Sequence, residues 1–145
     1  MEEMEGLFPV FDVPEVEEEE FDTEYKRSVK WDVDAGDFVR EGSGRIAECD
    51  GMEAYMIWCY KASQTERYEC LAYPDEIGVE MESATHDDDP KTVESMVRRT
   101  VTEALMANPR TESVENFSFS WEGGFMTGSC DVIGVGMEEA FHLLF

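Results

Sequence analysis

The side chains best suited to catalysis or metal binding are two histidines and four cysteines: His86, His142, Cys49, Cys59, Cys70 and Cys130. A Ser-His-Asp or Cys-His arrangement needs a base held against a nucleophile, and the local sequence around neither histidine supports one. The cysteines have no C-x-x-C spacing, so neither a zinc site nor a disulfide framework is indicated. The sequence gives no positive evidence for an enzyme.

A run of carboxylates follows His86 as Asp87, Asp88 and Asp89. Clustered carboxylates suit hard cations such as Ca²⁺ or Mg²⁺, but this spacing matches no EF-hand, so we expect a solvated loop and no metal site. Neither G-x-G-x-x-G nor G-x-x-x-x-G-K-[ST] occurs, which argues against a phosphate cradle. With 35 acidic residues in the chain, a chosen pair of carboxylates carries no signal for glycoside hydrolysis. We predict no cofactor.

The triplet Asn108-Pro109-Arg110 is a candidate binding site. Pro109 fixes its own φ and restricts Asn108, so Arg110 emerges from the turn at a defined angle. A guanidinium held in this way suits a carboxylate or a carbonyl group. The triplet either binds a partner protein or forms a local salt bridge inside the domain.

Arg67 presents the same two possibilities, because Glu66 and Glu69 stand close to it in the sequence. It either pairs with these acids within the domain or anchors a partner. We include it with the triplet as a candidate partner-binding residue.

Charge is the unusual feature of the composition, with 35 acidic against 11 basic residues and a net charge of −24. Phosphate backbones and anionic lipids repel such a surface, so nucleic acids and membranes are disfavoured as partners. Eleven of the acids lie in residues 1–24, which contain no basic residue, so the remainder carries about −13.

Residues 1–24 are predicted to be a disordered arm, because the run Glu17 to Glu20 repels itself and prolines lie nearby. Four apolar residues interrupt the acids: Leu7, Phe8, Val10 and Phe11. This apolar island either docks on a partner or on the domain, or has no specific role. The arm lacks the pattern of a secretory signal, so we expect a soluble chain made in the cytoplasm with reduced thiols.

The next elements start with a strand from Ser28 to Val33 that turns at 35–37 into a return strand over about 38–40. A helix over about 52–63, capped by Asp50, is apolar nearly all round and is therefore expected at the centre of the fold. The alternation in 67–73 predicts a further strand, and 83–89 a loop.

A second helix is predicted from Pro90, capped by Asp89, and ends at Asn108-Pro109. Its apolar stripe consists of Val93, Met96, Val97, Thr100, Val101, Ala104 and Leu105. Two strands follow, about 114–121 and 125–135, joined at Gly123-Gly124. Residues 137–145 are predicted to form two amphipathic helical turns as a C-terminal tail.

Residues 25–136 thus form one predicted α+β domain, with a mainly antiparallel sheet and two helices in the order β-β-α-β-(β)-α-β-β. A chain of 145 residues is long enough for one such core.

Several stretches carry a family likeness when taken in order: Lys30-Trp31-Asp32, the helix around Trp58, Thr65-Glu66-Arg67-Tyr68, Tyr73 before Gly78, and Leu105 followed by Asn108-Pro109-Arg110. Over about 25–135 the sequence resembles prophage tail proteins related to the T-even gene-twenty-five product, a lysozyme-like component of the baseplate wedge. Members carry an acidic-Pro-Arg triplet that holds the wedge bundle. Asn108-Pro109-Arg110 occupies that place, with asparagine instead of the acid.

The resemblance implies a non-enzymatic structural wedge subunit of a contractile phage tail or tail-like particle, present in about six copies around the tube. It implies larger wedge proteins, the sheath subunit and tube or hub proteins as partners, and a place in the particle's baseplate after assembly in the host cytoplasm. It also implies likeness to the strand-exchanging part of sheath subunits, so an exposed sheet edge would template the first sheath ring by β-augmentation.

An alternative from another class is an acidic DNA mimic that inhibits a host DNA-binding enzyme, as the charge of −24 suggests. Such a mimic needs carboxylates spaced across a folded surface. Nearly half of the net charge lies instead in residues 1–24. This distribution favours the wedge hypothesis.

Overall fold

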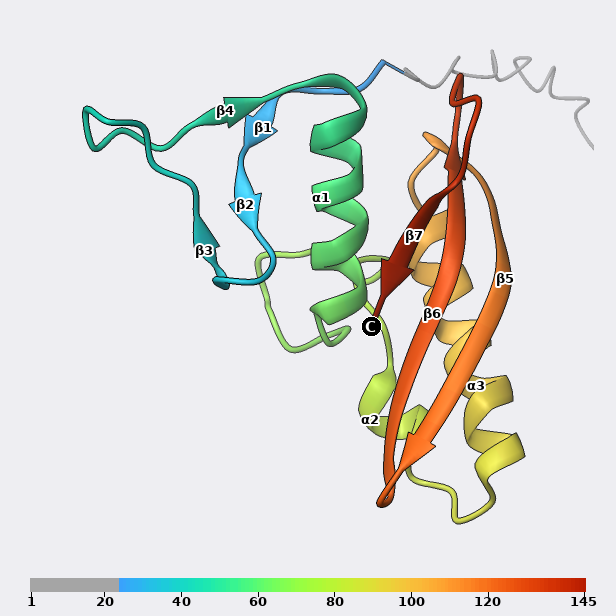
Figure 1. Ribbon diagram of the computed structural model, residues 1–145. Coiled ribbons are helices and arrows are strands. Elements are labelled where there is room, and N and C mark those ends of the chain that lie inside the picture. Colours follow the sequence, from blue (N-terminus) through green and yellow to red (C-terminus); the bar gives the residue numbers. More distant parts are fainter. Residues whose placement is uncertain (1–23) are drawn as a thin grey trace, which may run out of the picture.

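The computed structural model describes residues 24–145 (Figure 1). The predictions for the arm, including its disorder and its apolar island, concern residues that lie outside the described part, apart from Glu24. Helix α1 stands between two regions of the molecule. Four very short strands lie on one side of it, and a three-stranded sheet with helix α3 lies on the other (Figure 1).

The short strands form two antiparallel pairs. β1, Ser28–Val29, pairs with β4, Glu48–Cys49, and β2, Trp31–Asp32, pairs with β3, Asp37–Phe38. The rings of Trp31 and Phe38 meet edge to face, with their centroids 5.0 Å apart. The predicted first hairpin is therefore confirmed, although each of its strands is only two residues long.

Helix α1 spans Gly51–Gln64, close to the predicted bounds. Its side chains enter two separate cores: Ala54 and Ile57 pack with Cys49, whereas Tyr55 and Cys59 pack toward α3. Met52 and Met56 remain exposed. The expected central position is correct for two sides of the helix, and a third side stays open.

The strand predicted over 67–73 is wrong. Tyr68 has a φ of +72°, outside the extended region, and Leu71 is fully exposed, so the alternation in the sequence has no buried face to serve. Among the described residues, the surrounding chain forms one isolated parallel bridge, between Glu66 and Val79. Residues 66–79 are a loop whose base is closed by hydrogen bonds from Arg67 N–H to Val79 O and from Val79 N–H to Thr65 O, 2.8 and 2.9 Å.

Helix α2, Met81–Ala84, is a single turn at the start of the predicted loop. Helix α3, Pro90–Met106, then begins where the sequence predicted, and the Asp89 carboxylate accepts a bond from Thr92 N–H of 3.1 Å. Every residue of the predicted stripe is buried except Met96, which is half-buried. The Asp89 cap and the stripe of α3 are confirmed, whereas Asp50 stands at the N-cap of α1 without a side-chain hydrogen bond to the helix.

The predicted C-terminal hairpin is also confirmed. β5, Thr111–Glu122, and β6, Phe125–Gly134, are antiparallel with Glu122 opposite Phe125. The two residues between them, Gly123 and Gly124, have φ of +58° and +85°. Positive φ at both central positions is what the common two-residue hairpin turn requires.

The helical turns predicted for residues 137–145 are wrong, because Phe141–Leu144 form strand β7, which pairs antiparallel with β6. The segment alternates as well as it follows a helical period, with Leu143 buried and His142 and Leu144 exposed. β6 offers an open edge that satisfies the backbone of β7, which a two-turn helix could do less well. The sheet order is β5-β6-β7.

One main core joins the two helices and the sheet. Its buried members are Tyr55, Cys59, Val79, Ala84, Val93, Val97, Val101, Ala104, Leu105, Cys130, Val132 and Leu143. The fold is a single α+β domain with antiparallel sheets, as predicted, and it contains α2 in addition to the two expected helices.

Candidate functional site

The turn after α3 is held at every position of the predicted triplet. Asn108 Oδ1 accepts a bond of 3.0 Å from Arg110 N–H, and Asn108 O accepts one of 3.0 Å from Thr111 N–H. Arg110 O accepts from Val135 N–H at 2.8 Å, which ties the turn to the end of β6. The main chain of Arg110 is therefore fixed, as the proline and the asparagine predicted.

The side chain of Arg110 is half-buried and points to the start of the described chain. Its Nε donates to the carbonyl oxygen of Glu24. No carboxylate within residues 25–145 forms an ion pair with it. The local salt bridge that was the alternative for Arg110 is absent from this part of the chain.

Arg110 lines a small pocket of about 170 Å³, here called the Arg110 pocket. Its lining consists of Tyr25, Lys26, Arg27, Ser28, Ala54, Tyr55, Trp58, Asn108 and Arg110. Three of the chain's 11 basic residues gather there. Arg27 is already paired with Glu48, so Arg110 is the cation of this pocket that suits a partner's carboxylate, which a guanidinium binds through charge-assisted bonds.

Tyr25 and Tyr55 hold one wall of this pocket. The Tyr25 hydroxyl donates to Val135 O, and the two rings lie 5.2 Å apart. The Tyr55 hydroxyl shares a buried bond of 2.6 Å with Thr111 Oγ1. Burial raises the pKa of Tyr55, so the phenol stays protonated and acts as a structural group.

Arg67 lies in a different setting. Its side chain is only 11% exposed, and its Nε and Nη2 donate to Gly78 O at 3.3 and 3.2 Å. Its Nη1 lies 3.6 Å from a Glu80 carboxylate oxygen and 3.8 Å from one of Glu103. The guanidinium therefore joins the base of the 66–79 loop to α3.

These partners are not the ones suggested by proximity in sequence. Glu66 accepts bonds from the N–H groups of Met81 and Glu82, 3.1 and 3.2 Å, and so satisfies the start of α2. Among the described residues, no ion pair joins Arg67 to Glu66 or Glu69. The structure also does not bring Arg67 and Arg110 together, since they line different surface hollows.

Gly78 is part of the Arg67 arrangement. Its φ is +100°, and a Cβ at this position would lie 2.5 Å from Thr65 O, too close for any side chain. The close approach lets the carbonyl of Gly78 face the guanidinium while the loop base stays paired. Arg67 and Gly78 thus act as one unit.

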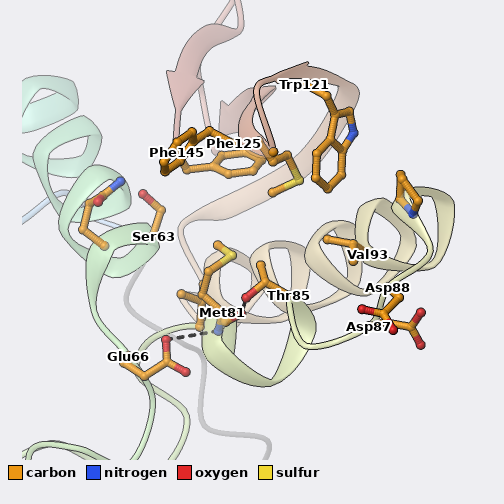
Figure 2. A pocket seen from close by; sticks show the side chains of 15 residues that line it. Ser63, Glu66, Met81, Thr85, Asp87, Asp88, Val93, Trp121, Phe125 and Phe145 are labelled. Atoms are coloured by element: carbon orange, nitrogen blue, oxygen red, sulfur yellow. Dashed lines mark hydrogen bonds between the residues drawn. The ribbon is translucent and has the colours of Figure 1, made fainter.

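Another hollow, here called the tip pocket, has a volume of about 540 Å³ and lies by the β5–β6 turn (Figure 2). Trp121, Phe125 and Phe145 form one side, and Met81, Thr85 and Val93 from α2 and α3 face them (Figure 2). Sequence reasoning missed it because its walls come from segments far apart in the chain. Its polar residues include no histidine or cysteine that could serve as base or nucleophile.

The cysteines and acidic side chains elsewhere in the described residues also form no arrangement suited to catalysis or metal binding. Burial raises the pKa of both Cys59 and Cys130 to about 12, so these thiols stay protonated. Within residues 24–145, no group of three or more His, Cys, Asp or Glu side chains could hold a metal ion. In that same part of the chain, no helix has the length and apolar character needed to cross a membrane.

Comparison with known proteins gives a family. No curated protein matches the chain. The sequence profile of the family described as "contractile injection system sheath initiator" matches residues 27–135, from just before β1 to just after β6, and includes Arg67 and the Asn108-Pro109-Arg110 turn. The match confirms the predicted likeness to a contractile-tail baseplate family and supports a structural, sheath-initiating role. The chain therefore belongs to the contractile injection system sheath initiator family.

Proposed function

We propose that this protein is a non-enzymatic wedge subunit of the baseplate and that it starts the sheath by offering the outer edge of β5 to a strand of the first sheath subunit. The observation that carries this is the sheet order β5-β6-β7. β5 is 12 residues long and pairs on one side only among the described strands. An exposed edge of this length is a template for an added strand.

The register identifies which groups the edge presents. Gly128 of β6 exchanges two main-chain bonds with Phe145, both 3.0 Å, so its N–H and C=O face β7. Phe119 lies opposite Gly128 on β5. In an antiparallel ladder such a residue is not bonded across the pair, so its own N–H and C=O face outward.

Side-chain packing holds this edge in place. The rings of Phe117 and Phe119 stack 6.3 Å apart, and the guanidinium of Arg98 from α3 lies 5.6 and 5.9 Å from their centroids. Phe145 meets both rings edge to face. A strand that is already rigid loses little entropy when a partner strand is added.

The wedge side of the function is assigned to the Arg110 pocket, at the opposite end of β5. Asn108, Pro109 and Arg110 form a fixed cationic turn, which suits a carboxylate on a larger wedge protein. The resemblance implies about six copies around the tube, next to tube or hub proteins, and we include this arrangement in the proposal. The alternative role as a DNA mimic gains no support from the family match.

Complementation of a gene deletion tests the β5 edge. Both Phe119→Pro and Phe119→Ala remove the ring, but only proline also removes the outward N–H. We expect tubes without sheath from Phe119→Pro and sheathed particles from Phe119→Ala, counted by negative-stain electron microscopy. Equal sheath formation by the two variants would exclude the outer edge of β5 as the template.

A further inference from the structure

An apolar groove of about 290 Å³ is lined by residues of α1, of β7 and of the chain at β2 and the start of the β2–β3 turn. Its lining consists of Trp31, Val33, Glu53, Met56, Ile57, Tyr60, Phe141, His142, Leu143 and Leu144. Val33, Met56 and Leu144 are 49%, 40% and 59% exposed, although all three are apolar. Large apolar side chains that gather in one exposed hollow mark an interaction site. We call this hollow the α1–β7 groove.

The main chain beside the groove is open as well. β7 pairs with β6 along one edge and with no other described strand. Because Phe145 bonds to Gly128 through both its N–H and its C=O, alternation along β7 turns the main-chain groups of Leu144 and His142 away from β6. An extended segment lying in the groove would meet both apolar side chains and free main-chain groups.

The charged side chains in and near the groove affect which kind of segment can bind there. Glu53 is the single carboxylate in the lining, and Lys30 neutralises it at 3.4 Å. Lys61 Nζ lies 4.9 Å from the centroid of the Trp31 ring, and no carboxylate of residues 24–145 forms an ion pair with it. The lining therefore holds no unpaired carboxylate, although Asp32 and Asp34 stand beside Val33 at the β2–β3 turn, and it suits an apolar segment whose acids lie outside the hollow.

We propose that the apolar island of the same chain, Leu7 to Phe11, binds in the α1–β7 groove. The island supplies four apolar side chains in five residues, with Glu5 and Asp12 on either side. Pro9 lacks an N–H, which an edge strand tolerates because one side of it faces solvent. Apolar burial drives the contact, and Glu5 and Asp12 flank the island, so they can remain in solvent at the two ends of the groove.

The chain between the island and the domain is long enough. The ring centroids of Tyr25 and Tyr55 are 5.2 Å apart and those of Tyr55 and Phe141 6.0 Å, so the Tyr25 ring lies within about 11 Å of the Phe141 ring in the groove lining. The 12 residues between Phe11 and Glu24 can extend to about 40 Å. Such a short tether gives an effective concentration in the millimolar range, so even a weak contact is well populated.

The tip pocket is the rival site, and its charges disfavour the island. Its lining contains the carboxylates Glu66, Asp87 and Asp88 and no lysine or arginine. Like charges close together raise the free energy of the bound state. An acid-flanked segment therefore fits the α1–β7 groove better. This inference is independent of the sheath-binding role of β5.

Photo-crosslinking of the full-length chain tests the contact. Phe8 is replaced by p-benzoylphenylalanine, the dilute protein is irradiated, and the crosslinked peptides of the monomer are mapped by mass spectrometry. We expect attachment to Met56 and to residues 141–144. The matched control carries the same amino acid in place of Val16, outside the island, and should give far less product at these positions.

A second pair of variants distinguishes the groove from other surfaces. Adding Met56→Glu should lower the yield roughly fivefold, because a carboxylate in the groove opposes both apolar contact and the acids of the arm. Leu71→Glu, at a fully exposed position elsewhere, should leave the yield unchanged. Attachment to the tip pocket, product found only in crosslinked dimers, or a yield insensitive to Met56→Glu would each overturn the assignment.

Discussion

Arg67 and Arg110 both lie within the matched residues 27–135, yet they use their guanidinium groups differently. Arg67 bonds to a carbonyl of its own domain and lies near two of its carboxylates, with its side chain almost entirely buried. Arg110 is half-buried, bonds through Nε to one main-chain oxygen and lines a surface pocket. An enclosed guanidinium stabilises the fold, whereas we propose that the partly open one on a rigid turn binds a partner.

The largest loss of stability should come from Arg67→Ala. The substitution leaves Gly78 O and Glu80 without their cation, while Glu103 keeps Arg99 at 3.7 Å, and we expect the free energy of unfolding to fall by about 3 kcal/mol. Urea unfolding followed by circular dichroism measures it. Arg67→Lys, which keeps the charge but loses the fork, should cost about half as much. A loss below about 1 kcal/mol for Arg67→Ala would show that the guanidinium is dispensable for folding.

The next effect should come from Gly78→Ala, which tests whether the loop base and Arg67 form one unit. A Cβ would meet Thr65 O at 2.5 Å at a φ of +100°, so we expect a loss of about 2 kcal/mol. Gly44→Ala is the matched control, because Gly44 has a φ of +81° but open space around it, and should cost about 1 kcal/mol. Equal losses at the two positions would contradict a steric role for the close contact.

The double variant of Arg67→Ala and Gly78→Ala sharpens the same point. Since both changes damage one arrangement, their combined loss should be smaller than the sum of the single losses. Strict additivity in urea unfolding would mean that the two residues stabilise the domain separately.

A smaller loss of unfolding free energy is expected from Asn108→Ala, in the turn that carries Arg110. The change removes the acceptor of the 3.0 Å bond from Arg110 N–H and should cost about 1 kcal/mol. Asn108→Asp keeps an acceptor oxygen and restores the acid implied by the resemblance, so its unfolding free energy should stay within about 0.5 kcal/mol of the natural chain. If Asn108→Asp is as unstable as Asn108→Ala, the amide nitrogen has a role that the acceptor does not explain.

The features that sequence predicted well rest on local signals. The Asp89 cap, the stripe of α3 and the Gly123-Gly124 turn each depend on residues within a few positions of one another, and all were found. The rigid Arg110 turn belongs to the same class, because Pro109 and Asn108 determine it on their own.

The features that sequence missed depend on tertiary neighbours. The segment 67–73 alternates like a strand but finds no partner edge, while 137–145 has a helical pattern and is captured by the edge of β6. The partners of Arg67 lie 11 to 36 positions away in the sequence. The nearby acids Glu66 and Glu69, which proximity in sequence suggested, are therefore not its partners. Local pattern carries no information on which edge or carboxylate the fold brings close.

The smallest effect on folding should come from Arg110→Ala, and it decides the comparison between the two arginines. Loss of one partly exposed hydrogen bond to Glu24 O should lower the unfolding free energy by less than about 1 kcal/mol. Incorporation into baseplates, measured by immunoblot of purified particles after complementation, should nevertheless fall strongly, because the cation at the centre of the Arg110 pocket is gone.

Arg110→Lys is the control, since it keeps the charge but not the planar fork, and intermediate incorporation is expected. The two substitutions should thus rank oppositely in the two assays. Arg67→Ala should give the larger loss of unfolding free energy in urea, and Arg110→Ala the larger loss of incorporation into particles. If Arg110→Ala unfolds as easily as Arg67→Ala, both residues brace the domain. The partner of the wedge subunit would then have to be sought at the β5 edge alone, since the Arg110 pocket would be an internal joint between the start of the described chain and the end of α3.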